Sequence, residues 1–410
     1  MANTILTHQI IAREAAAMFQ EATPFISRIN RKRERDFGKE SAGYGIGQTV
    51  TVKIPPASQV FAGSQFAGGG SAPDQVEQSV SLTVNNQLHV PLAFTAVQKA
   101  MYLTEFKDRF LKPAIQTLAS QVQYNMLLQG YRSVANTVGL AGSIPTSMLT
   151  YGQARAKLEN SLAPDSDRTL LFSSDANLNL VDASKGLLNP TKEVQDMFYK
   201  GYIGAANDME FFECQSLPVH TLGNQVAFTI NGASQSGSTL NIGGLTNTNV
   251  LKAGTVFTIP GVYAVHPLLG TPYPYLRQFV ITADLTAAGT TGAISIYPPI
   301  NWGVGSGGSA SMTALPTVSA APGNGATVVL LGSVSTGYRQ NLAFQRDAFA
   351  AAFVPLPVLA STEGYTFTTD DFSIRVMTGG DFVNDLERTR IDVLWGMGTI
   401  RPDHACRITE

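Results

Sequence analysis

The feature that most constrains the fold is an abrupt change of composition in the second half of the chain. From Thr221 to Gln340 glycine, serine, threonine and asparagine dominate, and only four residues are charged: Lys252, Arg277, Asp284 and Arg339. The sequence on either side mixes helix-forming and strand-forming patterns. We therefore expect residues 221–341 to be a domain inserted into an α+β protein.

Short strand patterns recur through this low-charge segment. Short strands separated by turn-forming residues are typical of a small β-barrel or β-sandwich. The strands that we expect are Gln225–Ile230, Thr239–Ile242, Thr255–Ile259, Tyr275–Ala283, Ala293–Tyr297 and Ala326–Leu331.

The N-terminal residues predict an amphipathic helix. Thr4–Phe25 carries one apolar stripe at helical spacing, formed by Ile11, Ala15, Met18, Ala22 and Phe25. Such a helix must bury its stripe, either against this chain or against a partner. A basic cluster follows, interrupted by two acidic residues, and consists of Arg28, Arg31, Lys32, Arg33 and Arg35. It can face phosphate groups, but the interleaved acids favour a plain solvated face.

Three alternating segments indicate a long hairpin-like region. Their apolar residues are Val50, Val52 and Ile54, then Val80, Leu82 and Val84, and then Leu88, Val90, Leu92 and Phe94. Period-two alternation is typical of strands with one buried face. The Gly- and Ala-rich stretch Pro55–Gln78 is longer than the loops of most compact domains. An arm that lies on a neighbouring subunit would explain this length, since an isolated two-stranded arm is only marginally stable.

A long helix is expected over Thr104–Ser133. Its apolar face continues after Pro113 through Ile115, Leu118, Val122, Met126 and Gln129. Pro113 lacks a backbone N–H, so it either begins a new helix or kinks one. The result is a helix suited to act as a structural spine.

The remaining sequence indicates an α+β region that surrounds the insertion. Helices are expected at Thr150–Asn160, Asp175–Asp182 and Thr191–Tyr199, and a buried strand at Arg168–Phe172. Near the C-terminus, Phe372, Ile374 and Val376 alternate with polar residues, as do Ile391, Val393 and Trp395. We expect long strands there, then a turn at Arg401-Pro402 and a final strand His404–Ile408.

Composition limits the class of protein. Charged residues make up 14 % of the chain, against about 25 % in ordinary soluble proteins. A chain that buries much of its surface against other subunits would show this bias, and so would a mildly charged β-rich protein. The net charge of −2 gives no basic footprint for sequence-specific nucleic-acid binding. With no secretory signal and no membrane-spanning stretch, we expect the chain to stay in the cytoplasm where it is made.

No motif predicts catalysis, a cofactor or a metal. The glycines at 43, 45 and 47 and at 303, 305 and 307 lack the strand and helix of a nucleotide-binding loop. The histidines are scattered, at His8, His89, His220, His266 and His404. Only His404 and Cys406 come close together, and a zinc site needs further ligands.

The acidic residues and the cysteines are equally uninformative. Asp165-Ser-Asp167 lacks the rest of a calcium loop. The pairs Asp370–Asp371 and Asp381–Asp385 are explained as well by loop caps as by a carboxylate pair. The two cysteines, Cys214 and Cys406, are interpreted as packing residues.

The order of these elements resembles one family. An N-terminal arm, a hairpin arm, a spine helix, an α+β domain, an inserted β domain and returning strands are similar to the Hong Kong 97 fold of tailed-phage capsid proteins. The insertion resembles that of P22-type coat proteins. Five stretches carry the resemblance: ATPFISRI, DRFLKPAIQTLASQV, SLPVHT, NLAFQRDAFAAAFVPLPV and RTRIDVLWGMGTIRPDHACRI.

The resemblance implies an α+β fold with a defined domain order. Residues 1–40 would be the N-terminal arm, 41–95 the extended hairpin or E-loop, and 96–145 the P-domain with the spine helix. Residues 146–220 would be the A-domain, 221–341 an all-β barrel-like insertion, and 342–410 the returning strands of the A- and P-domains. No fused protease or scaffold segment is expected, because the pattern begins near residue 1.

The resemblance also implies a function. The chain would be a major capsid protein that self-assembles, with a scaffolding protein, into a procapsid in the host bacterial cytoplasm. The procapsid would expand as double-stranded DNA is packaged, and the chain would end in the virion. Partners would be hexamers and pentamers of the same chain, the scaffolding protein, the portal protein and the packaged DNA. A decoration protein is left open, and no membrane is involved.

Residue roles follow from the resemblance only loosely. An acidic residue of the arm would meet a basic motif of the scaffolding protein, with Glu14 and Glu21 as candidates. The basic cluster Arg28, Arg31, Lys32, Arg33 and Arg35 would face the DNA on the inner side of the shell. The insertion would make contacts between capsomers, and its low charge favours hydrogen bonds or apolar contacts over salt bridges.

Two alternatives remain at this stage. A phage tail, fibre or surface β-protein would suit the Gly- and Ser-rich strands, but the spine helix and the N-terminal arm argue against it. An enzyme with a β-rich binding module would need acids or histidines that converge in a cleft, and the sequence offers none beyond chance.

Overall fold

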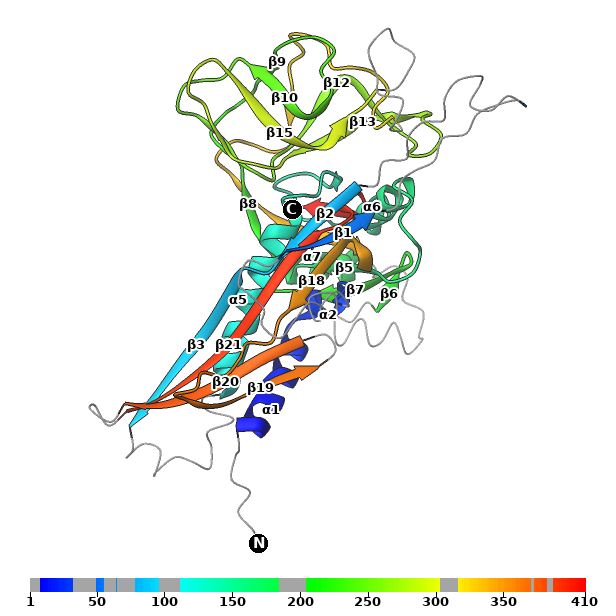
Figure 1. The fold of residues 1–410 in the computed structure, drawn as a ribbon. Helices are drawn as coiled ribbons and strands as arrows, with labels where there is room; N and C mark the ends of the chain where they lie inside the picture. The colour runs from blue at the N-terminus through cyan, green and yellow to red at the C-terminus, as the bar shows by residue number, and fades with distance from the viewer. Residues whose placement is uncertain are drawn as a thin grey trace, which may run out of the picture. The chain divides into compact units, whose positions relative to one another are not determined.

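The computed structural model describes residues 8–31, 49–54, 64, 78–95, 111–183, 204–302, 316–369, 372–381 and 386–410 (Figure 1). By its contacts the chain divides into two compact units. The first consists of Met1–Val52, Val80–Leu127 and Phe349–Ile400. The second consists of Lys53–Ser79, Leu128–Ala348 and Arg401–Glu410.

The first unit is organised around one long strand, β21 (Leu386–Thr399). One edge of β21 pairs with β18 (Phe349–Phe353) and β20 (Phe372–Asp381), and its other edge pairs with β3 (Asn86–Thr95). The strand β19 (Glu363–Thr369) pairs with β20 and completes the five-stranded sheet. Alternating apolar residues predicted β20 and β21 correctly, and Phe372, Ile374, Val376, Ile391, Val393 and Trp395 are all buried. Residues between them, including Arg375, Asp392 and Leu394, are buried as well.

The N-terminal helix packs against this sheet, and it ends three residues before the expected Phe25. It divides into α1 (His8–Ala22) and α2 (Pro24–Arg28) because Pro24 cannot continue the hydrogen bonds of α1. The helix α1 contacts β19 and β20, and Phe19 stacks on Phe372 with ring centroids 4.6 Å apart. The arm therefore buries its apolar face against its own chain.

The buried face of α1 is rotated from the expected stripe. Ala12, Ala15, Ala16 and Phe19 are buried, whereas Ile11, Met18 and Ala22 are only half-buried. Three small alanines let the helix backbone approach the sheet closely, so packing selects the small side chains rather than the larger ones.

The hairpin-like region is built differently from the prediction. The strands β1 (Thr49–Ile54) and β2 (Gln78–Thr83) pair with each other as expected. The third strand, β3, instead crosses to β21, and its residues 86–95 pair with residues 395–386. Apart from Ser64 and Gln78, the expected arm Pro55–Gln78 lies outside the described residues.

The predicted spine helix is α5 (Lys112–Tyr131), with Pro113 in its first turn. Ile115, Leu118, Val122 and Met126 are buried as predicted, but Gln129 is exposed and Tyr131 is buried instead. The buried Gln123 accepts a hydrogen bond from the backbone N–H of Phe25 at 3.2 Å, which ties α2 to α5. The expected first part of this helix, Thr104–Phe110, lies outside the described residues.

The second unit contains a seven-stranded core sheet. Its strands follow the order β4-β22-β17-β5-β7-β6, and β8 also pairs with β17. The bounds are β4 Thr137–Val138, β5 Arg168–Phe172, β6 Ala205–Ala206, β7 Met209–Glu213, β8 Val219–Thr221, β17 Gly337–Gln345 and β22 Ala405–Thr409.

The helices of the second unit agree with the sequence where they are described. They are α6 (Met148–Asn160) and α7 (Ser174–Ala183), whereas Thr191–Tyr199 is not among the described residues. Two short 3₁₀ turns, η5 (Arg346–Ala348) and η6 (Pro402–His404), flank the strands of the first unit in sequence. The expected strand His404–Ile408 begins one residue later, because His404 belongs to η6.

A second sheet occupies residues 222–336, which we call the β region. Its order is β16-β12-β13-β15-β10-β9. The bounds are β9 Thr229–Ile230, β10 Gly237–Gly243, β12 Val256–Val265, β13 Pro272–Ile281, β15 Thr291–Ile300 and β16 Val329–Leu330. Each of the six predicted strands has a counterpart, although β9 and β16 keep only two residues each, and the short pair β11 (Val250–Leu251) and β14 (Leu285–Thr286) was not expected.

The sheet of the β region closes on itself. The backbone N–H of Ile230 donates to the carbonyl of Ala326 at 3.0 Å, and that of Val328 donates to Phe228 at 3.0 Å. These bonds join the β9 end of the sheet to the chain that leads into β16. Closure removes the exposed edges that an open sheet would present.

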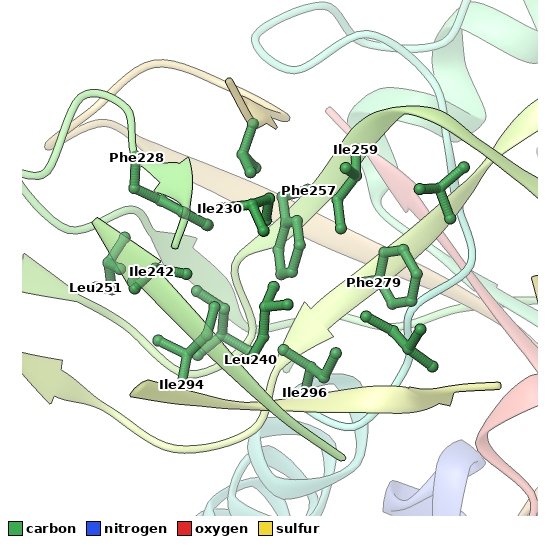
Figure 2. Packing of buried hydrophobic residues seen from close by; sticks show 14 of the residues in the cluster. Phe228, Ile230, Leu240, Ile242, Leu251, Phe257, Ile259, Phe279, Ile294 and Ile296 are labelled. Carbon is green, nitrogen blue, oxygen red and sulfur yellow. The ribbon is translucent and has the colours of Figure 1, made fainter. Parts of the chain in front are cut away.

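Aromatic and branched side chains fill the interior of this closed sheet (Figure 2). The ring of Phe257 stacks on that of Phe279, with centroids 5.6 Å apart. It meets the ring of Phe228 edge-on, with centroids 5.5 Å apart. The isoleucines of β10 and β15 complete the cluster. The β region thus has a hydrophobic core of its own.

Candidate functional site

The chain enters and leaves the β region through one pair of strands. Strand β8 pairs antiparallel with β17, and Thr221 faces Gly337. Beyond them the backbone N–H of Leu222 donates to Thr336 at 3.2 Å, and that of Ser335 donates to Gly223 at 3.1 Å. A stem of two paired strands therefore connects the β region to the core sheet.

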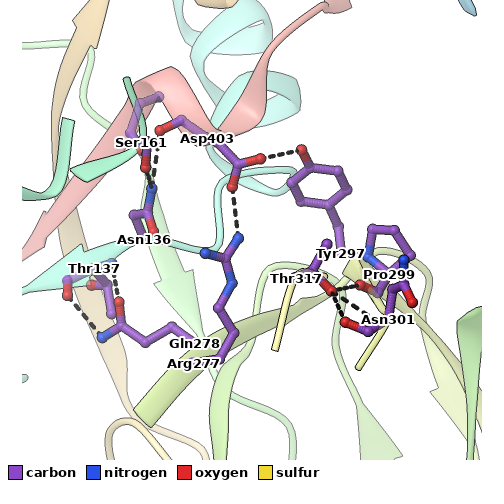
Figure 3. A network of polar contacts seen from close by, with 11 residues as sticks. Asn136, Thr137, Ser161, Arg277, Gln278, Tyr297, Pro299, Asn301, Thr317 and Asp403 are labelled. Atoms are coloured by element: carbon purple, nitrogen blue, oxygen red, sulfur yellow. Dashed lines mark hydrogen bonds and ion pairs between the residues drawn. The ribbon is translucent and has the colours of Figure 1, made fainter. Parts of the chain in front are cut away.

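An ion pair adds a second connection (Figure 3). The Nη2 atom of Arg277, on β13, donates to Oδ1 of Asp403 in η6 at 2.9 Å. The hydroxyl of Tyr297, on β15, donates to Oδ2 of the same carboxylate at 2.7 Å. Burial, and then the charge of Asp403, raises the pKa of Tyr297 well above its ordinary value, so the phenol stays a donor. Two adjacent strands of the β region thus hold one carboxylate of the core.

Amide side chains make the neighbouring connection. The Oε1 atom of Gln278 accepts from the backbone N–H of Thr137 at 3.0 Å, and its Nε2 donates to the Thr137 carbonyl at 2.9 Å. The side chain of Gln278 therefore pairs with β4 as a strand backbone would. Beside it, Nδ2 of Asn136 donates to the carbonyl of Asp403 at 3.1 Å, which fixes the turn that carries the carboxylate.

A buried polar cluster around one cation, Arg407, lies where β8 meets the β region. The guanidinium of Arg407, on β22, is 2 % exposed and donates to the Gly254 carbonyl at 2.8 Å. It lies 5.6 Å from the ring centroid of Tyr131, whose hydroxyl is 3.1 Å from Nδ1 of His220. The other nitrogen of His220 is 3.3 Å from Oγ1 of Thr255. Burial lowers the pKa of Arg407 to about 10 and that of His220 to about 3.

Gly254 is required by this arrangement. Its φ is +93°, a conformation that side chains with a Cβ rarely adopt, and a Cβ there would lie 3.1 Å from Tyr131 and 3.2 Å from His220. The close approach lets Arg407 reach the Gly254 carbonyl.

We call these residues the junction: Tyr131, Asn136, Thr137, His220, Gly254, Thr255, Arg277, Gln278, Tyr297, Asp403 and Arg407. The contacts of the junction attach the β region to the core sheet. The hydrogen bonds of the junction join residues far apart in sequence, and their number and directions restrict how the β region can turn about its stem.

The groups with reactive potential are held in unreactive forms. Burial raises the pKa of the Cys214 thiol to about 11 and that of Cys406 to about 12, so neither is a thiolate near neutral pH. Burial lowers the pKa of His404 to about 4. His404 lies in η6 rather than at the start of the final strand, so it and Cys406 do not lie on one strand. Within the described part of the chain, no group of three or more potential metal ligands comes together.

The site residues expected from sequence lie outside the junction. Arg28 ends α2 and Arg31 follows it, and both are half-buried; between them Asn30 pairs with Ala350 of β18. Lys32, Arg33 and Arg35 lie outside the described residues. Glu14 is half-buried on α1, and Glu21 belongs to the last turn of the same helix.

Sequence reasoning missed the junction, although one signal was present. Arg277 is one of only four charged residues between Thr221 and Gln340. A charged residue in a segment with almost no charge indicates that it has a specific partner. Nothing in the sequence identifies Asp403 as that partner.

Comparison with known proteins decides the family. The family model of the P22 coat protein, gene protein 5, matches residues 31–407. The chain belongs to the P22 coat protein family. As a member it is a major capsid protein, a structural protein that forms the icosahedral head of a bacteriophage and is located in the capsid of the virion. The family assignment favours the capsid hypothesis over a tail protein or an enzyme.

Solved phage structures are similar to this coat protein at low identity. A chain of Mycobacterium phage Che8 is 12 % identical, with a TM-score of 0.48, and the match covers 94 % of this chain and 90 % of that one. A chain from the capsid of the cyanophage P-SCSP1u is 10 % identical, with a TM-score of 0.43 and 91 % of each chain covered. The I-domain of the CUS-3 coat protein is 22 % identical, with a TM-score of 0.20, and covers 26 % of this chain and 95 % of that one.

Two further findings complete the comparison. No curated protein matches the sequence. In the described residues of this coat protein, no helix has the length and apolar character that crossing a bilayer requires.

Proposed function

We propose that this coat protein assembles first into a scaffold-assisted procapsid in the host bacterial cytoplasm, and that the procapsid expands as double-stranded DNA is packaged. The family supports a shell of identical subunits. The scaffolding protein, the portal protein, the packaged DNA and a decoration protein are the partners that such a pathway involves. The proposal includes the domain order expected from sequence, with the arm, the E-loop, the P-domain and the A-domain around the insertion.

The β region acts in this scheme as an inserted domain with a fixed orientation. The observation that carries this is the bond between Arg277 and Asp403, which is reinforced by Tyr297. A two-stranded stem alone would act as a hinge, since it leaves rotation about its own axis free. Side-chain bonds from two strands of the β region to one turn of the core oppose that rotation. A domain held in this way can present the same surface on every subunit of a shell.

The N-terminal arm has two proposed roles. The basic cluster Arg28–Arg35 contacts packaged DNA on the inner face of the shell without sequence preference. Glu14 or Glu21 contacts the scaffolding protein. Packing of α1 on β19 and β20 keeps the arm on its own subunit, so its acidic residues can be presented in one place.

Electron microscopy tests the assembly pathway. The purified chain is imaged in negative stain, alone and after co-expression with the neighbouring genes. Closed shells of uniform diameter are expected, at least in the co-expressed sample. Monodisperse monomers or small oligomers in every condition would contradict the proposal.

Variants test the individual roles. Arg277→Gln together with Tyr297→Phe is expected to reduce the yield of uniform shells, because the β region is then free to turn about the stem. The matched control is Arg155→Gln, which removes an exposed ion pair with Asp208 and should leave shells unchanged.

Charge removal tests the arm. Replacing Arg28 and Arg31 by glutamine should lower DNA retention by filled heads, and unchanged packaging and retention would remove the DNA-contact assignment. Glu14→Gln and Glu21→Gln should weaken co-purification of the scaffolding protein, and a scaffold that binds both variants normally would remove that assignment.

A further inference from the structure

Two chemically labile dipeptides lie at the seam where the β region closes on itself. The sequence contains Asn-Gly only twice, at Asn231-Gly232 and at Asn324-Gly325. Both pairs adjoin the seam bonds, because the N–H of Gly325 donates to the Ile230 carbonyl at 2.8 Å. Asparagine is among the thermolabile residues of proteins. It is most reactive before glycine, which has no side chain to shield its backbone nitrogen.

The reaction that threatens such a pair is deamidation. The backbone nitrogen of the glycine loses its proton and attacks Cγ of the asparagine. A bond forms between this nitrogen and Cγ, the bond from Cγ to the side-chain nitrogen breaks, and that nitrogen takes up a proton and leaves as ammonia. Water then opens the cyclic imide at one of its two carbonyls and leaves aspartate or isoaspartate. An N–H that donates a hydrogen bond is less available, since the bond must break before the nitrogen can attack.

A hydrogen bond between the two pairs holds the attacking nitrogen of the first. The backbone N–H of Gly232 donates to Oδ1 of Asn324 at 2.8 Å. On the other side of the peptide group, the Asn231 carbonyl accepts from Nε2 of Gln235 at 3.1 Å. The N–H of Asn231 donates to the carbonyl of Asn241, on β10, at 3.0 Å. The backbone that would have to move during attack is therefore fixed by three contacts.

The carbon that would be attacked is more accessible. Asn231 is exposed, and its side chain lies beside Gly243 of β10, where a Cβ would be 3.6 Å from its Cβ and 4.0 Å from its Cγ. A neighbour without a side chain restrains the amide of Asn231 little. Protection of this pair therefore depends on the Gly232 nitrogen rather than on burial of the asparagine.

We propose that Asn231 is a deamidation site of this chain, and that Asn324 restrains the reaction in the folded protein by holding the Gly232 nitrogen. The bond joins segments that meet only in the closed seam, so local opening of the seam releases the nitrogen. Conversion would add a carboxylate to a region with only three charged residues. Isoaspartate would also lengthen the main chain by one carbon beside Ile230. A subunit of a virion is not replaced, so slow conversion accumulates.

Peptide mapping by mass spectrometry measures the reaction in the purified full chain, incubated in mildly alkaline buffer. Asn324→Ala is expected to raise the rate of conversion at Asn231 about fivefold, because one hydrogen bond of ordinary strength is lost. Asn324→Asp should keep the slow rate, since a carboxylate oxygen accepts the same bond.

Asn249→Ala is the matched control. It removes an asparagine whose Nδ2 donates to the Asn224 carbonyl at 3.3 Å in another turn of the β region, and it should leave the rate at Asn231 unchanged. In the chain unfolded by guanidinium chloride, conversion at Asn231 should be faster than in folded Asn324→Ala, because every restraint on the nitrogen is then lost.

Hydrogen–deuterium exchange separates direct protection from loss of the fold. In Asn324→Ala the Gly232 amide should exchange faster, whereas the amides of Ile230 and Val328, which close the seam through backbone bonds, should exchange as in the unaltered chain. Faster exchange at all three amides would overturn the proposal, since opening of the whole seam would then explain the result. Equal conversion at Asn231 in the folded and unfolded chains would overturn it too, as would equal conversion in Asn324→Ala and Asn249→Ala.

Discussion

Replacing Asp392 with asparagine is expected to lower the free energy of unfolding of the first unit by about 3–5 kcal/mol. Asp392 lies at the centre of the long sheet, with no exposed surface. Its Oδ2 accepts from Nε and Nη2 of Arg375, on the neighbouring strand β20, at 3.2 and 2.8 Å. Its Oδ1 accepts from Nε of Arg390 at 2.6 Å and from Nε2 of Gln87, on β3, at 3.3 Å. One carboxylate thus connects three strands.

The size of this loss in unfolding free energy follows from the groups that lose their partner in the variant. Arg375 is 6 % exposed, so loss of the facing charge leaves a buried guanidinium with no opposite charge from Asp392. Among the described residues, it also donates from its Nη1 to the Pro357 carbonyl at 2.5 Å. Breaking a buried pair from one side costs more than the pair contributes, because the remaining charge stays desolvated. Asparagine also presents an N–H₂ group to donors, so at least one of the four hydrogen bonds becomes a donor–donor contact.

Urea unfolding, followed by the fluorescence of Trp395 on β21, measures the effect. The control is Asp208→Asn, because Asp208 and Arg155 form an exposed pair at 2.5 Å and should contribute less than about 1 kcal/mol. A double variant that replaces Asp392 and Arg375 by leucine and methionine should recover much of the loss. A loss below about 1 kcal/mol in Asp392→Asn would refute the reasoning, since it would mean that water already reaches the pair.

Three other substitutions follow from single contacts. Tyr297→Phe should lower stability by about 1.5–3 kcal/mol in urea unfolding, because it removes a hydrogen bond to the charged Asp403. His220→Gln should reduce the acid sensitivity of the second unit: burial holds the pKa of His220 near 3, so only the unfolded chain takes up its proton below about pH 6.5. Stability should therefore fall by about 1.4 kcal/mol per unit as pH drops from 6.5 toward 3, and this component should vanish in the variant, as urea titrations at several pH values would show. Gly396→Ala should prevent soluble expression or lower the melting temperature strongly, because its Cβ would meet the Thr83 carbonyl oxygen at 2.3 Å.

Local sequence patterns predicted the helices and strands in which apolar, buried residues follow one another or recur at a regular spacing. The strand Arg168–Phe172 is buried at every residue, and its sequence RTLLF reads as a short apolar run. The apolar residues that alternate along β20 and β21 are buried, and so are those at helical spacing along α5. On the two strands the polar residues between them, such as Arg375 and Asp392, are buried as well, so the alternation there separates an apolar face from a polar face.

Pairings between distant segments could not be predicted in the same way. Nothing in the alternation of Leu88, Val90 and Leu92 distinguishes a partner 300 residues later from the adjacent β2, because both present a pleated edge of the same spacing. At Pro24 two sequence signals conflict, because the apolar spacing continues across it while the proline lacks the N–H that a continuous helix needs, and the structure follows the proline. The junction could not be predicted for a similar reason, because Arg277 and Asp403 meet only after both sheets have formed.

The low charge of the β region can be related to how its charges are used. Within residues 222–336 the charged residues are Lys252, Arg277 and Asp284. Arg277 binds Asp403 of the core, and Oδ1 of Asp284 accepts from the backbone N–H of Ala253 at 2.6 Å. Two of the three charged residues therefore make contacts within the chain. The surface of the β region has few charges left for an ionic partner to bind.

If the β region makes contacts in the shell, as expected of the insertion, those contacts should be largely apolar or hydrogen-bonded. Apolar burial strengthens slightly as salt rises, whereas ion pairs between exposed charges weaken within a Debye length of about 8–10 Å. Shells of this coat protein should accordingly keep their stability between low and high salt, as light scattering during dissociation would measure. A steep loss of shell stability with added salt would place the main contacts on the charged first unit instead.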